Sequence, residues 1–230
     1  MKRGKNYKAL QDLVDNSKSY SIPEAIAILG QSKIKFDQTV EVHMNLGVDP
    51  RHSDQVVRGN VALPNGTGKD VKVLVFAKGA NVEAAKEAGA FKVGAEDLVE
   101  EIQGGWLDFD VVVATPDTMP IIGRLARILG PRGLMPSPKN GTVTPNVSKV
   151  ITELKAGKIS YRVDKGSNVH APVGKLSFEP AKLAENIESF LENVKKARPA
   201  SSKGTYIKSL TLTATHTPAV PLDMALTRGA

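Results

Sequence analysis

The chain has 230 residues, enough for one large domain or two small ones, and its 41% hydrophobic and 24% charged residues argue against wholesale disorder. The absence of cysteine excludes disulfides, cysteine nucleophiles and thiolate metal sites. With 31 Lys and Arg against 24 Asp and Glu, the net charge of +7 suggests a polyanionic partner, although charge alone leaves open a nucleic acid, an anionic membrane surface or no such partner.

The first 70 residues predict a helix, a half-exposed strand and a turn. Residues 1–13 are polar and basic, so no secretory signal is expected, and no run of about 20 apolar residues predicts a membrane span. Ser-Ile-Pro-Glu at residues 21–24 matches a capping box and predicts a helix that continues to Leu29. Residues 39–48 alternate polar and apolar side chains, as in a strand with one solvent face, and residues 63–69 form a turn cluster.

The middle of the chain follows a different pattern. Residues 71–77 and 110–114 are almost continuously apolar and predict buried strands. Residues 81–88 and 119–129 predict helices, and the alternation indicates a small parallel α/β unit. A Gly/Pro loop follows at residues 129–138, in which Arg132 either belongs to a simple helix stop or is presented to phosphate.

The half-exposed pattern returns near the end of the chain. Residues 158–163 alternate, and residues 206–215 predict a last strand. Residues 180–196 predict a helix with one buried face, formed by Leu183, Ile187, Phe190, Leu191 and Val194. The tail after Pro218 is expected to fray.

Charge follows the same division. Residues 67–157 hold 11 basic and 11 acidic side chains, so the remainder holds 31 − 11 = 20 basic and 24 − 11 = 13 acidic ones and carries the whole excess of +7. We therefore expect one α+β domain built from both chain ends, residues 1–66 and 158–230, with an inserted Rossmann-like α/β domain at 67–157. The polyanion site is expected on the flanking segments.

The main rival is a nucleotide-using enzyme on the central α/β domain, because parallel α/β units often bind nucleotides. The turn after the first central strand, Lys78-Gly79-Ala80-Asn81, lacks the glycines of a dinucleotide fingerprint, and no phosphate loop or nucleophile elbow is present. No metal-ligand spacing joins the four histidines, which are His43, His52, His170 and His216. No cofactor and no metal are expected. Asp110 is expected to start the second central strand, and Asp117 is expected to cap the helix that follows it.

Basic and aromatic residues on the flanks suit RNA better. Lys33, Lys35 and Phe36 precede one strand, and Arg162, Asp164 and Lys165 follow another, near Tyr161. Basic groups neutralise phosphates, rings stack on unpaired bases, and Thr hydroxyls can contact the ribose 2′-hydroxyl. A solvated charge or a core aromatic is equally compatible with each single residue, and a lone aromatic such as Phe36 is usually core.

Several motifs in order resemble the bacterial form of the ribosomal protein L-one family, the first protein of the large ribosomal subunit. The most distinctive is Ile122-Gly-Arg-Leu-Ala-Arg-Ile-Leu-Gly-Pro-Arg-Gly-Leu-Met-Pro136. The others are residues 4–7 (Gly-Lys-Asn-Tyr), 63–69 (Leu-Pro-Asn-Gly-Thr-Gly-Lys), 110–117 (Asp-Val-Val-Val-Ala-Thr-Pro-Asp) and 170–175 (His-Ala-Pro-Val-Gly-Lys). The resemblance implies the same discontinuous architecture, with an α+β domain that grips RNA and an inserted α/β domain.

The resemblance also implies partners and a role. These are large-subunit ribosomal RNA at the base of a mobile stalk beside the transfer-RNA exit site, release of deacylated transfer RNA, and repression of translation through the chain's own operon messenger RNA. The protein is then a cytoplasmic, ribosome-bound non-enzyme without homo-oligomer or membrane contact. The RNA-binding residues that it implies are Lys5, Lys35, Phe36, Thr39, Arg162, Asp164, Lys165, His170, Thr215, His216 and Thr217.

The last three of these residues depart from the family pattern. The family has Thr-Met-Gly where this chain has Thr215-His216-Thr217. A glycine would allow close approach of RNA or a positive φ, and the β-branched Thr217 makes both harder. His216 could stack or hydrogen-bond in place of methionine.

Overall fold

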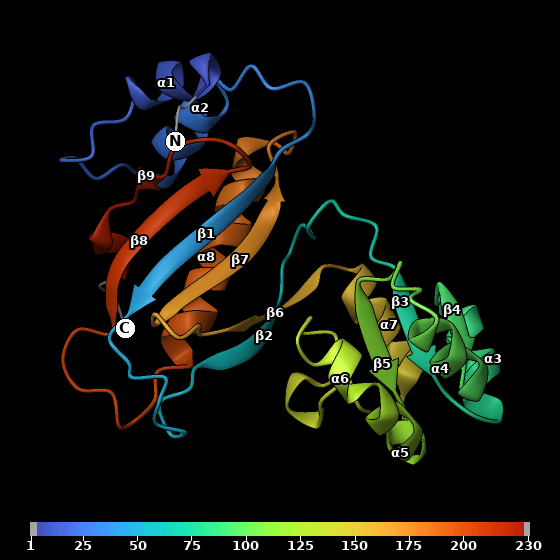
Figure 1. Cartoon of the computed structure of the whole chain (residues 1–230). Helices are drawn as coiled ribbons and strands as arrows, with labels where there is room; N and C mark the ends of the chain where they lie inside the picture. Colours follow the sequence, from blue (N-terminus) through green and yellow to red (C-terminus); the bar gives the residue numbers. More distant parts are fainter. Residues whose placement is uncertain (1–3, 228–230) are drawn as a thin grey trace. The chain divides into compact units, whose positions relative to one another are not determined.

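The computed structural model describes residues 4–227 and divides into two compact units (Figure 1). Both ends of the chain, up to Gly68 and from Ile159 onward, build the first, which we call the terminal unit. The second, the central unit, is Lys69–Lys158. Among the described residues, no helix is long and apolar enough to cross a membrane.

The terminal unit is organised around an antiparallel sheet with the strand order β7-β1-β8-β9. Its strands are β1 (Thr39–Leu46), β7 (Asn168–Lys175), β8 (Ile207–Ala214) and β9 (Val220–Pro221). Along β1, buried and half-exposed residues alternate, as the sequence predicts for a strand with one solvent face. Because β1 lies between β7 and β8, a strand from the first part of the chain is hydrogen-bonded on both sides to strands from its last part.

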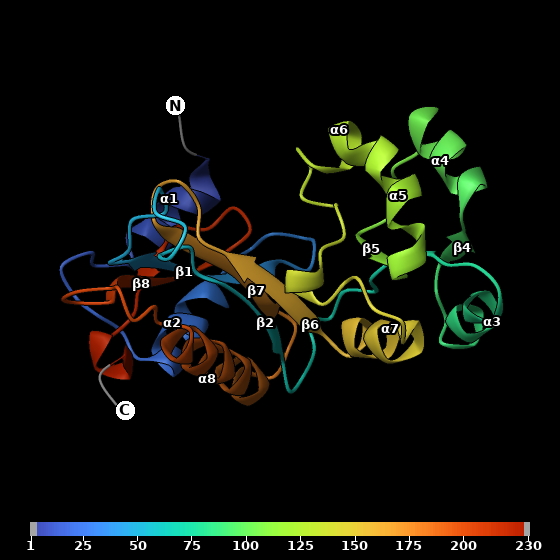
Figure 2. The same ribbon diagram turned by 90° about the horizontal axis from the view of Figure 1, so that it is seen from below.

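Two helices, α2 (Ile22–Leu29) and α8 (Pro180–Lys196), cover one face of this sheet (Figure 2). The predicted helix at residues 180–196 is confirmed, and so is its buried face. The predicted start of α2 is confirmed as well, because Glu24 Oε2 accepts hydrogen bonds from the Ser21 backbone N–H (2.9 Å) and hydroxyl (2.8 Å). These bonds lower the pKa of Glu24. A short helix, α1 (Lys5–Gln11), precedes them.

A second, two-stranded sheet pairs β2 (Arg58–Ala62) with β6 (Lys158–Arg162). Tyr161 on β6 is buried, stands edge-on to Phe190 and donates its hydroxyl to Asn193 Oδ1 at 2.8 Å. A Cβ at Gly59 would lie 2.6 Å from the Tyr161 hydroxyl, so only glycine fits beside this ring without displacement. Tyr161 is therefore a core residue, despite its place in the sequence next to the basic segment.

The turn at residues 63–68 is fastened to α8 by one buried amide. Asn186 Oδ1 accepts the Asn65 backbone N–H at 3.0 Å, and its Nδ2 donates to the carbonyls of Gly66 (2.9 Å) and Val173 (2.8 Å). Asn186 is completely buried. Gly68 has a φ of +70°, and a Cβ there would lie 2.7 Å from the Phe178 ring. This turn pattern therefore has a structural explanation in the terminal unit.

The central unit contains a three-stranded parallel sheet with the order β4-β3-β5, which confirms the predicted parallel α/β pattern. Its strands are β3 (Val73–Phe76), β4 (Lys92–Gly94) and β5 (Val111–Ala114). Its longer helices are α3 (Ala80–Glu87), α4 (Glu96–Gln103) and α7 (Val147–Lys155). Separate apolar clusters fill the two sides of the sheet, so its strands are buried on both faces.

The single helix predicted at residues 119–129 is wrong. The segment is broken into α5 (Met119–Ile122), the 3₁₀ turn η2 (Gly123–Leu125) and α6 (Ala126–Leu129). Gly123 weakens the helix at the break, and Leu125, at φ −92° and ψ 0°, lies at the edge of the right-handed helical region. Ile122, Leu125 and Leu129 are nevertheless buried, which explains the apolar periodicity.

Two smaller expectations also fail. The described part of the tail after Pro218 is folded, because β9 pairs with β8, Val220 and Leu222 are buried, and the 3₁₀ turn η4 (Met224–Thr227) follows. Asp117 lies inside the 3₁₀ turn η1 (Pro116–Thr118), so it is not a helix cap. A further 3₁₀ turn, η3 (Pro138–Asn140), follows the Gly/Pro loop.

Replacement of Asn186 by alanine tests the fastening of the turn. Asn186→Ala leaves one N–H and two carbonyls without their buried partner, so we expect the free energy of unfolding of the terminal unit to fall by about 2–4 kcal/mol. The measurement is urea denaturation followed by circular dichroism.

Glu185→Ala is the matched control, because Glu185 is exposed and only its carboxylate contacts the same turn, through the Asn65 side chain. We expect a change of about 0.5 kcal/mol or less. The fluorescence of Trp106, the chain's one tryptophan, reports on the central unit and should be unchanged. Equal effects of the two substitutions would contradict the assigned role of Asn186.

Candidate nucleic-acid interface

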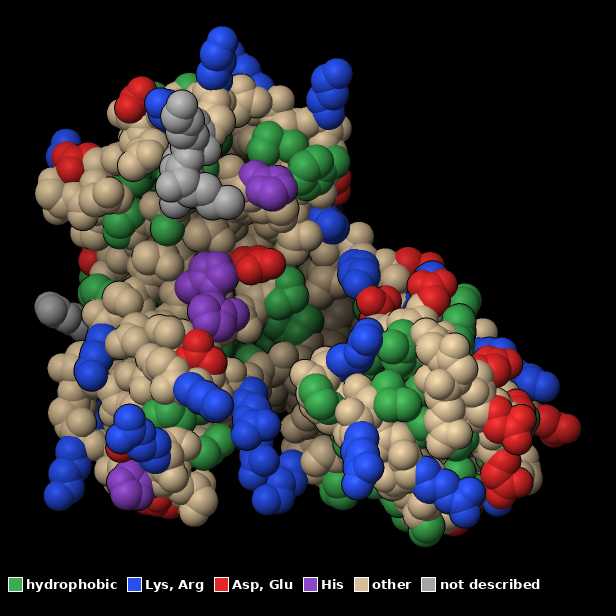
Figure 3. Space-filling model, viewed as in Figure 1, with side chains coloured by type: hydrophobic (Ala, Val, Ile, Leu, Met, Phe, Trp, Pro, Cys, Tyr) green, Lys and Arg blue, Asp and Glu red, His purple; other side chains and the backbone are tan. Residues whose placement is uncertain are grey.

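The face of the antiparallel sheet that α2 and α8 leave uncovered is polar. Figure 3 shows it toward the viewer, with histidine side chains at its centre, acidic side chains beside them, and lysine and arginine side chains farther out. We call this surface the polar sheet face. It is formed by the half-exposed or exposed side chains of Thr39, Glu41, His43, Asn45, Asn168, His170, Pro172, Thr211 and Thr213.

At one end of this face, three distant stretches of chain meet. The Lys175 ammonium donates to Thr39 Oγ1 at 2.9 Å, and the Thr215 backbone N–H donates to the Thr39 carbonyl at 3.1 Å. The buried side chain of Gln38 donates to the Thr215 carbonyl. We call this group, with Phe36 and His216, the strand-end cluster. It joins residues 36–39, just before and at the start of β1, to the turn after β8 through hydrogen bonds to the backbone of Thr39 and Thr215.

Phe36 projects from the strand-end cluster and is 50% exposed, so the alternative of a core residue does not hold. The ring of His216 stands edge-on to it, with centroids 6.0 Å apart and an interplanar angle of 81°. Lys35, next to Phe36, is also exposed. An exposed ring beside cations is the arrangement on which an unpaired base can stack.

The departure from the family pattern at residues 215–217 is accommodated locally. The positive φ of this turn, +65°, falls on His216 and not on Thr217. The Thr217 hydroxyl accepts the Ala214 N–H at 2.9 Å and lies 2.9 Å from the Ala214 carbonyl. Thr217 therefore closes the turn, and the strain expected at this position falls on its neighbour.

Further cations gather where β6 leads into β7. Arg162 and Lys165 line a pocket of about 440 Å³ together with Arg51, a residue that the sequence did not single out. Asp164 builds the turn between the strands, because its Oδ1 accepts the backbone N–H groups of Gly166 (2.8 Å) and Asn168 (2.7 Å). The Asn168 bond is the main cause of the lowered pKa of Asp164. Its carboxylate is thus engaged within the protein.

At the centre of the polar sheet face, two histidines form a pair. His43 and His170 are directly opposite in the β1–β7 register, and their Nδ1 atoms lie 2.6 Å apart. His43 Nε2 lies 2.9 Å from Thr213 Oγ1, and His170 Nε2 lies 3.4 Å from Asp164 Oδ2. A chain of polar contacts thus crosses β7, β1 and β8.

The geometry limits how many protons the pair can hold. A hydrogen bond between the two Nδ1 atoms needs one N–H and one lone pair, so both rings cannot be protonated while the bond persists. Burial, followed by the neighbouring His170, lowers the pKa of His43 below its ordinary value of 6.5, and Glu41 acts in the opposite direction. At most one positive charge is therefore shared across this part of the face.

The remaining candidate, Lys5, lies elsewhere. It is the first residue of α1. Together with Lys33 it lines a separate pocket, and none of the described residues that line this pocket belongs to a strand. The structure adds side chains that sequence reasoning missed: His43, Lys175, Arg51 and Thr213. Lys175 could have been found, because it ends the motif at residues 170–175 that supports the family resemblance. His43 could not, because its position beside His170 depends on the register of β1 and β7. Among residues 4–227, no cluster of three or more metal-binding side chains occurs.

Comparison with known proteins covers nearly the whole chain. Residues 28–218 match the Ribosomal protein L1p/L10e family. The chain is 52% identical over 225 residues to the large ribosomal subunit protein uL1 of Saccharophagus degradans, and this alignment covers 97% of each protein. It is 53% identical over 228 residues to the protein of the same name from Saccharopolyspora erythraea, which covers 99% of this chain and 96% of the relative. Both alignments thus include both units.

The histidine pair makes a titration prediction. We expect the pKa of His43 to lie below 6.5, and His170→Gln to raise it by removing one of the two causes of the shift. Nuclear magnetic resonance titration of the imidazole signals measures both values. A pKa at or above 6.5 in the unaltered protein would contradict the pair.

The lowered pKa of His43 also determines how the stability of the terminal unit depends on pH. Because the folded chain resists protonation of His43, the unfolded chain binds more protons once the pH falls below 6.5. The free energy of unfolding of the terminal unit therefore falls as the pH drops from 6.5 toward the lowered pKa. His43→Gln should flatten this dependence, which urea denaturation at several pH values would detect.

Proposed function

Because the chain belongs to the ribosomal protein L1p/L10e family, we propose that it binds ribosomal RNA of the large subunit through the polar sheet face and the strand-end cluster. The relatives are named as proteins of the large ribosomal subunit, and the chain is a ribosomal protein and not an enzyme. We further propose that it is bound at the base of a mobile stalk, assists release of deacylated transfer RNA and represses its own operon messenger RNA.

The observation that carries the proposal is the strand-end cluster. Residues more than 130 positions apart in the sequence, such as Thr39 and Lys175, are held together there by hydrogen bonds. The result is a fixed arrangement of an exposed ring, hydroxyl groups and cations at the edge of a solvent-facing sheet. Rigid placement favours recognition of one RNA shape over general attraction to phosphate.

Each group has a role suited to its chemistry. Lys35, Arg162 and Lys165 are exposed cations for phosphate oxygens, and Phe36 offers a surface for an unpaired base. The hydroxyls of Thr213 and Thr215 suit the ribose 2′-hydroxyl. Glu41 cannot attract phosphate and instead suits a hydrogen-bond donor on a base or ribose, which adds discrimination.

The distribution of net charge along the chain supports a binding site on the terminal unit. The central 91 residues, 67–157, carry equal numbers of basic and acidic side chains, and the excess of +7 belongs to the rest of the chain. The basic excess that favours a polyanionic partner therefore belongs to the terminal unit. The rival enzyme on the central α/β unit gains no support, because the turn from β3 to α3 offers Gly79 alone.

A filter-binding titration tests the proposed specificity. We expect a stalk fragment of large-subunit ribosomal RNA to bind at least about 10³-fold more tightly than an unrelated duplex, with affinity falling as salt rises. A chain that joins residues 1–66 to 158–230 should keep most of this affinity. Equal affinity for both RNAs, or full affinity in residues 67–157 alone, would overturn the assignment.

Single substitutions test the strand-end cluster. Phe36→Ala and Lys35→Ala should each weaken binding of the stalk fragment by about 1 kcal/mol, because they remove a stacking surface and a charged hydrogen bond. Phe91→Ala is the matched control, because Phe91 is 49% exposed and lies in the central unit. If Phe91→Ala weakens binding as much as Phe36→Ala, the cluster is not the base-stacking site.

A further inference from the structure

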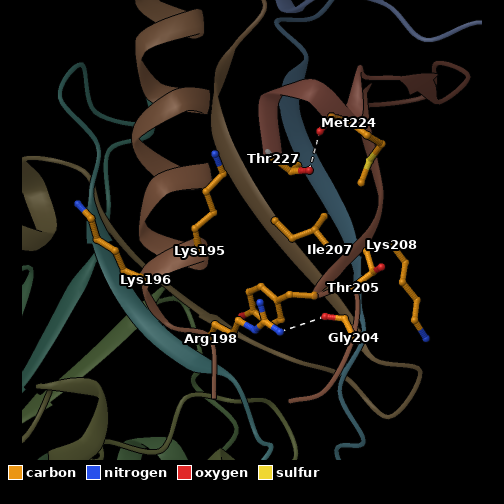
Figure 4. Close-up of a pocket in the computed structure, with 10 residues that line it drawn as sticks. Lys195, Lys196, Arg198, Gly204, Thr205, Ile207, Lys208, Met224 and Thr227 are labelled. Atoms are coloured by element: carbon orange, nitrogen blue, oxygen red, sulfur yellow. Dashed lines mark hydrogen bonds between the residues drawn. The ribbon is translucent and has the colours of Figure 1, made fainter. Parts of the chain in front are cut away.

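The terminal unit contains a second basic site, away from the polar sheet face. It is a pocket of about 550 Å³ where the end of α8, the loop before β8 and the turn η4 meet (Figure 4). Four cations line it: Lys195, Lys196, Arg198 and Lys208. No carboxylate is among its described lining residues. We call it the α8-end pocket.

Two of these cations are held in place by backbone carbonyls. The Lys195 ammonium donates to the Leu226 carbonyl at 2.6 Å. Arg198 Nη2 donates to the carbonyls of Ser202 (3.2 Å) and Gly204 (3.0 Å), and the guanidinium lies 5.8 Å from the centre of the Tyr206 ring. Carbonyls fix the position of a cation without neutralising its charge, so both side chains are positioned and still positive.

The helix dipole explains only part of this arrangement. Lys195 and Lys196 stand in the last turn of α8, where cations are favoured, and Lys196 also lies 3.6 Å from Glu192. Lys208, however, comes from β8, and Arg198 is turned back to the loop at Gly204 (Figure 4). Cations from α8, from the loop after it and from β8 therefore line one pocket, and Glu192, which lies near Lys196, is not among its lining residues.

The other walls of the α8-end pocket suit the rest of a nucleotide. Ile207 and Met224 are apolar, and Thr205 and Thr227 carry hydroxyls. A volume of about 550 Å³ is within the range of roughly 300–1,000 Å³ that accommodates small-molecule ligands, and it exceeds what a lone phosphate needs. An anion with a flat or apolar part matches this combination better than a simple ion.

We propose that the α8-end pocket binds the phosphate of a nucleotide, with the carbonyl-held Arg198 and Lys195 and the exposed Lys196 and Lys208 as its contacts. This site goes beyond the proposed RNA contact at the polar sheet face. The nucleotide has two possible sources, a free nucleoside diphosphate or one residue of an RNA strand, and the test below separates them.

The experiment uses the full chain and two double variants of equal charge. Lys196→Gln with Lys208→Gln removes two of the four cations of the pocket and leaves both carbonyl-held residues in place. Lys18→Gln with Lys182→Gln is the control, because these exposed lysines of the terminal unit each lie near one carboxylate and line no part of the pocket. Adenosine 5′-diphosphate is titrated by calorimetry, and the stalk RNA fragment by filter binding.

A free nucleotide is the source if adenosine diphosphate binds and the pocket variant weakens it by about tenfold or more relative to the control, as expected when two cations no longer reach its phosphates. An RNA strand is the source if adenosine diphosphate does not bind, while the pocket variant alone lowers RNA affinity. The slope of RNA affinity against log salt should then fall by about 0.7–0.9 for each phosphate that the variant no longer neutralises.

The proposal is overturned if the pocket variant and the control behave alike in both titrations. A different result would show that the polar sheet face does not bind RNA: Phe36→Ala would then leave RNA binding unchanged. Even so, the difference between the two double variants would still show whether the pocket binds a nucleotide.

Discussion

The position of β1 between β7 and β8 is the constraint on which the terminal unit depends. Both neighbours of this strand come from the last third of the chain, so neither end of the sequence can complete the sheet without the other. Its buried side chains, including Val40, Val42, Met44 and Leu46, belong to one apolar cluster with α2 and α8. This pairing lets a separate unit with its own cores be inserted between Gly68 and Ile159.

The same pairing creates the proposed interface. When one face of β1 is buried against helices, period 2 turns every other side chain toward solvent, beside the matching side chains of β7 and β8. Thr39 is thereby placed opposite Lys175, and His43 opposite His170. Chain termini that look unrelated in sequence supply one surface, in the part of the chain that carries the whole net charge.

Local signals in the sequence predicted local structure well. The capping box at Ser21 and Glu24 and the apolar stripe of α8 each depend on neighbours within a few residues, and both are confirmed. Features that depend on cross-strand register were not predictable: β2, the burial of Tyr161 and the contact between His43 and His170. Phe36 shows the same limit, because exposure of a lone aromatic is set by which strands surround it. The candidate residues were found through family resemblance, but their joining into one cluster required the structure.

In the proposed complex, the polar sheet face, and not the central unit, contacts the RNA. Backbone amide shifts recorded by nuclear magnetic resonance on addition of the stalk RNA fragment would test it most directly. We expect the largest shifts in β1, in β7, at the end of β8 and in the turn at His216, with little change in α3 and α4. Shifts concentrated in the central unit, or on the helices α2 and α8 that cover the opposite side of the sheet, would contradict it.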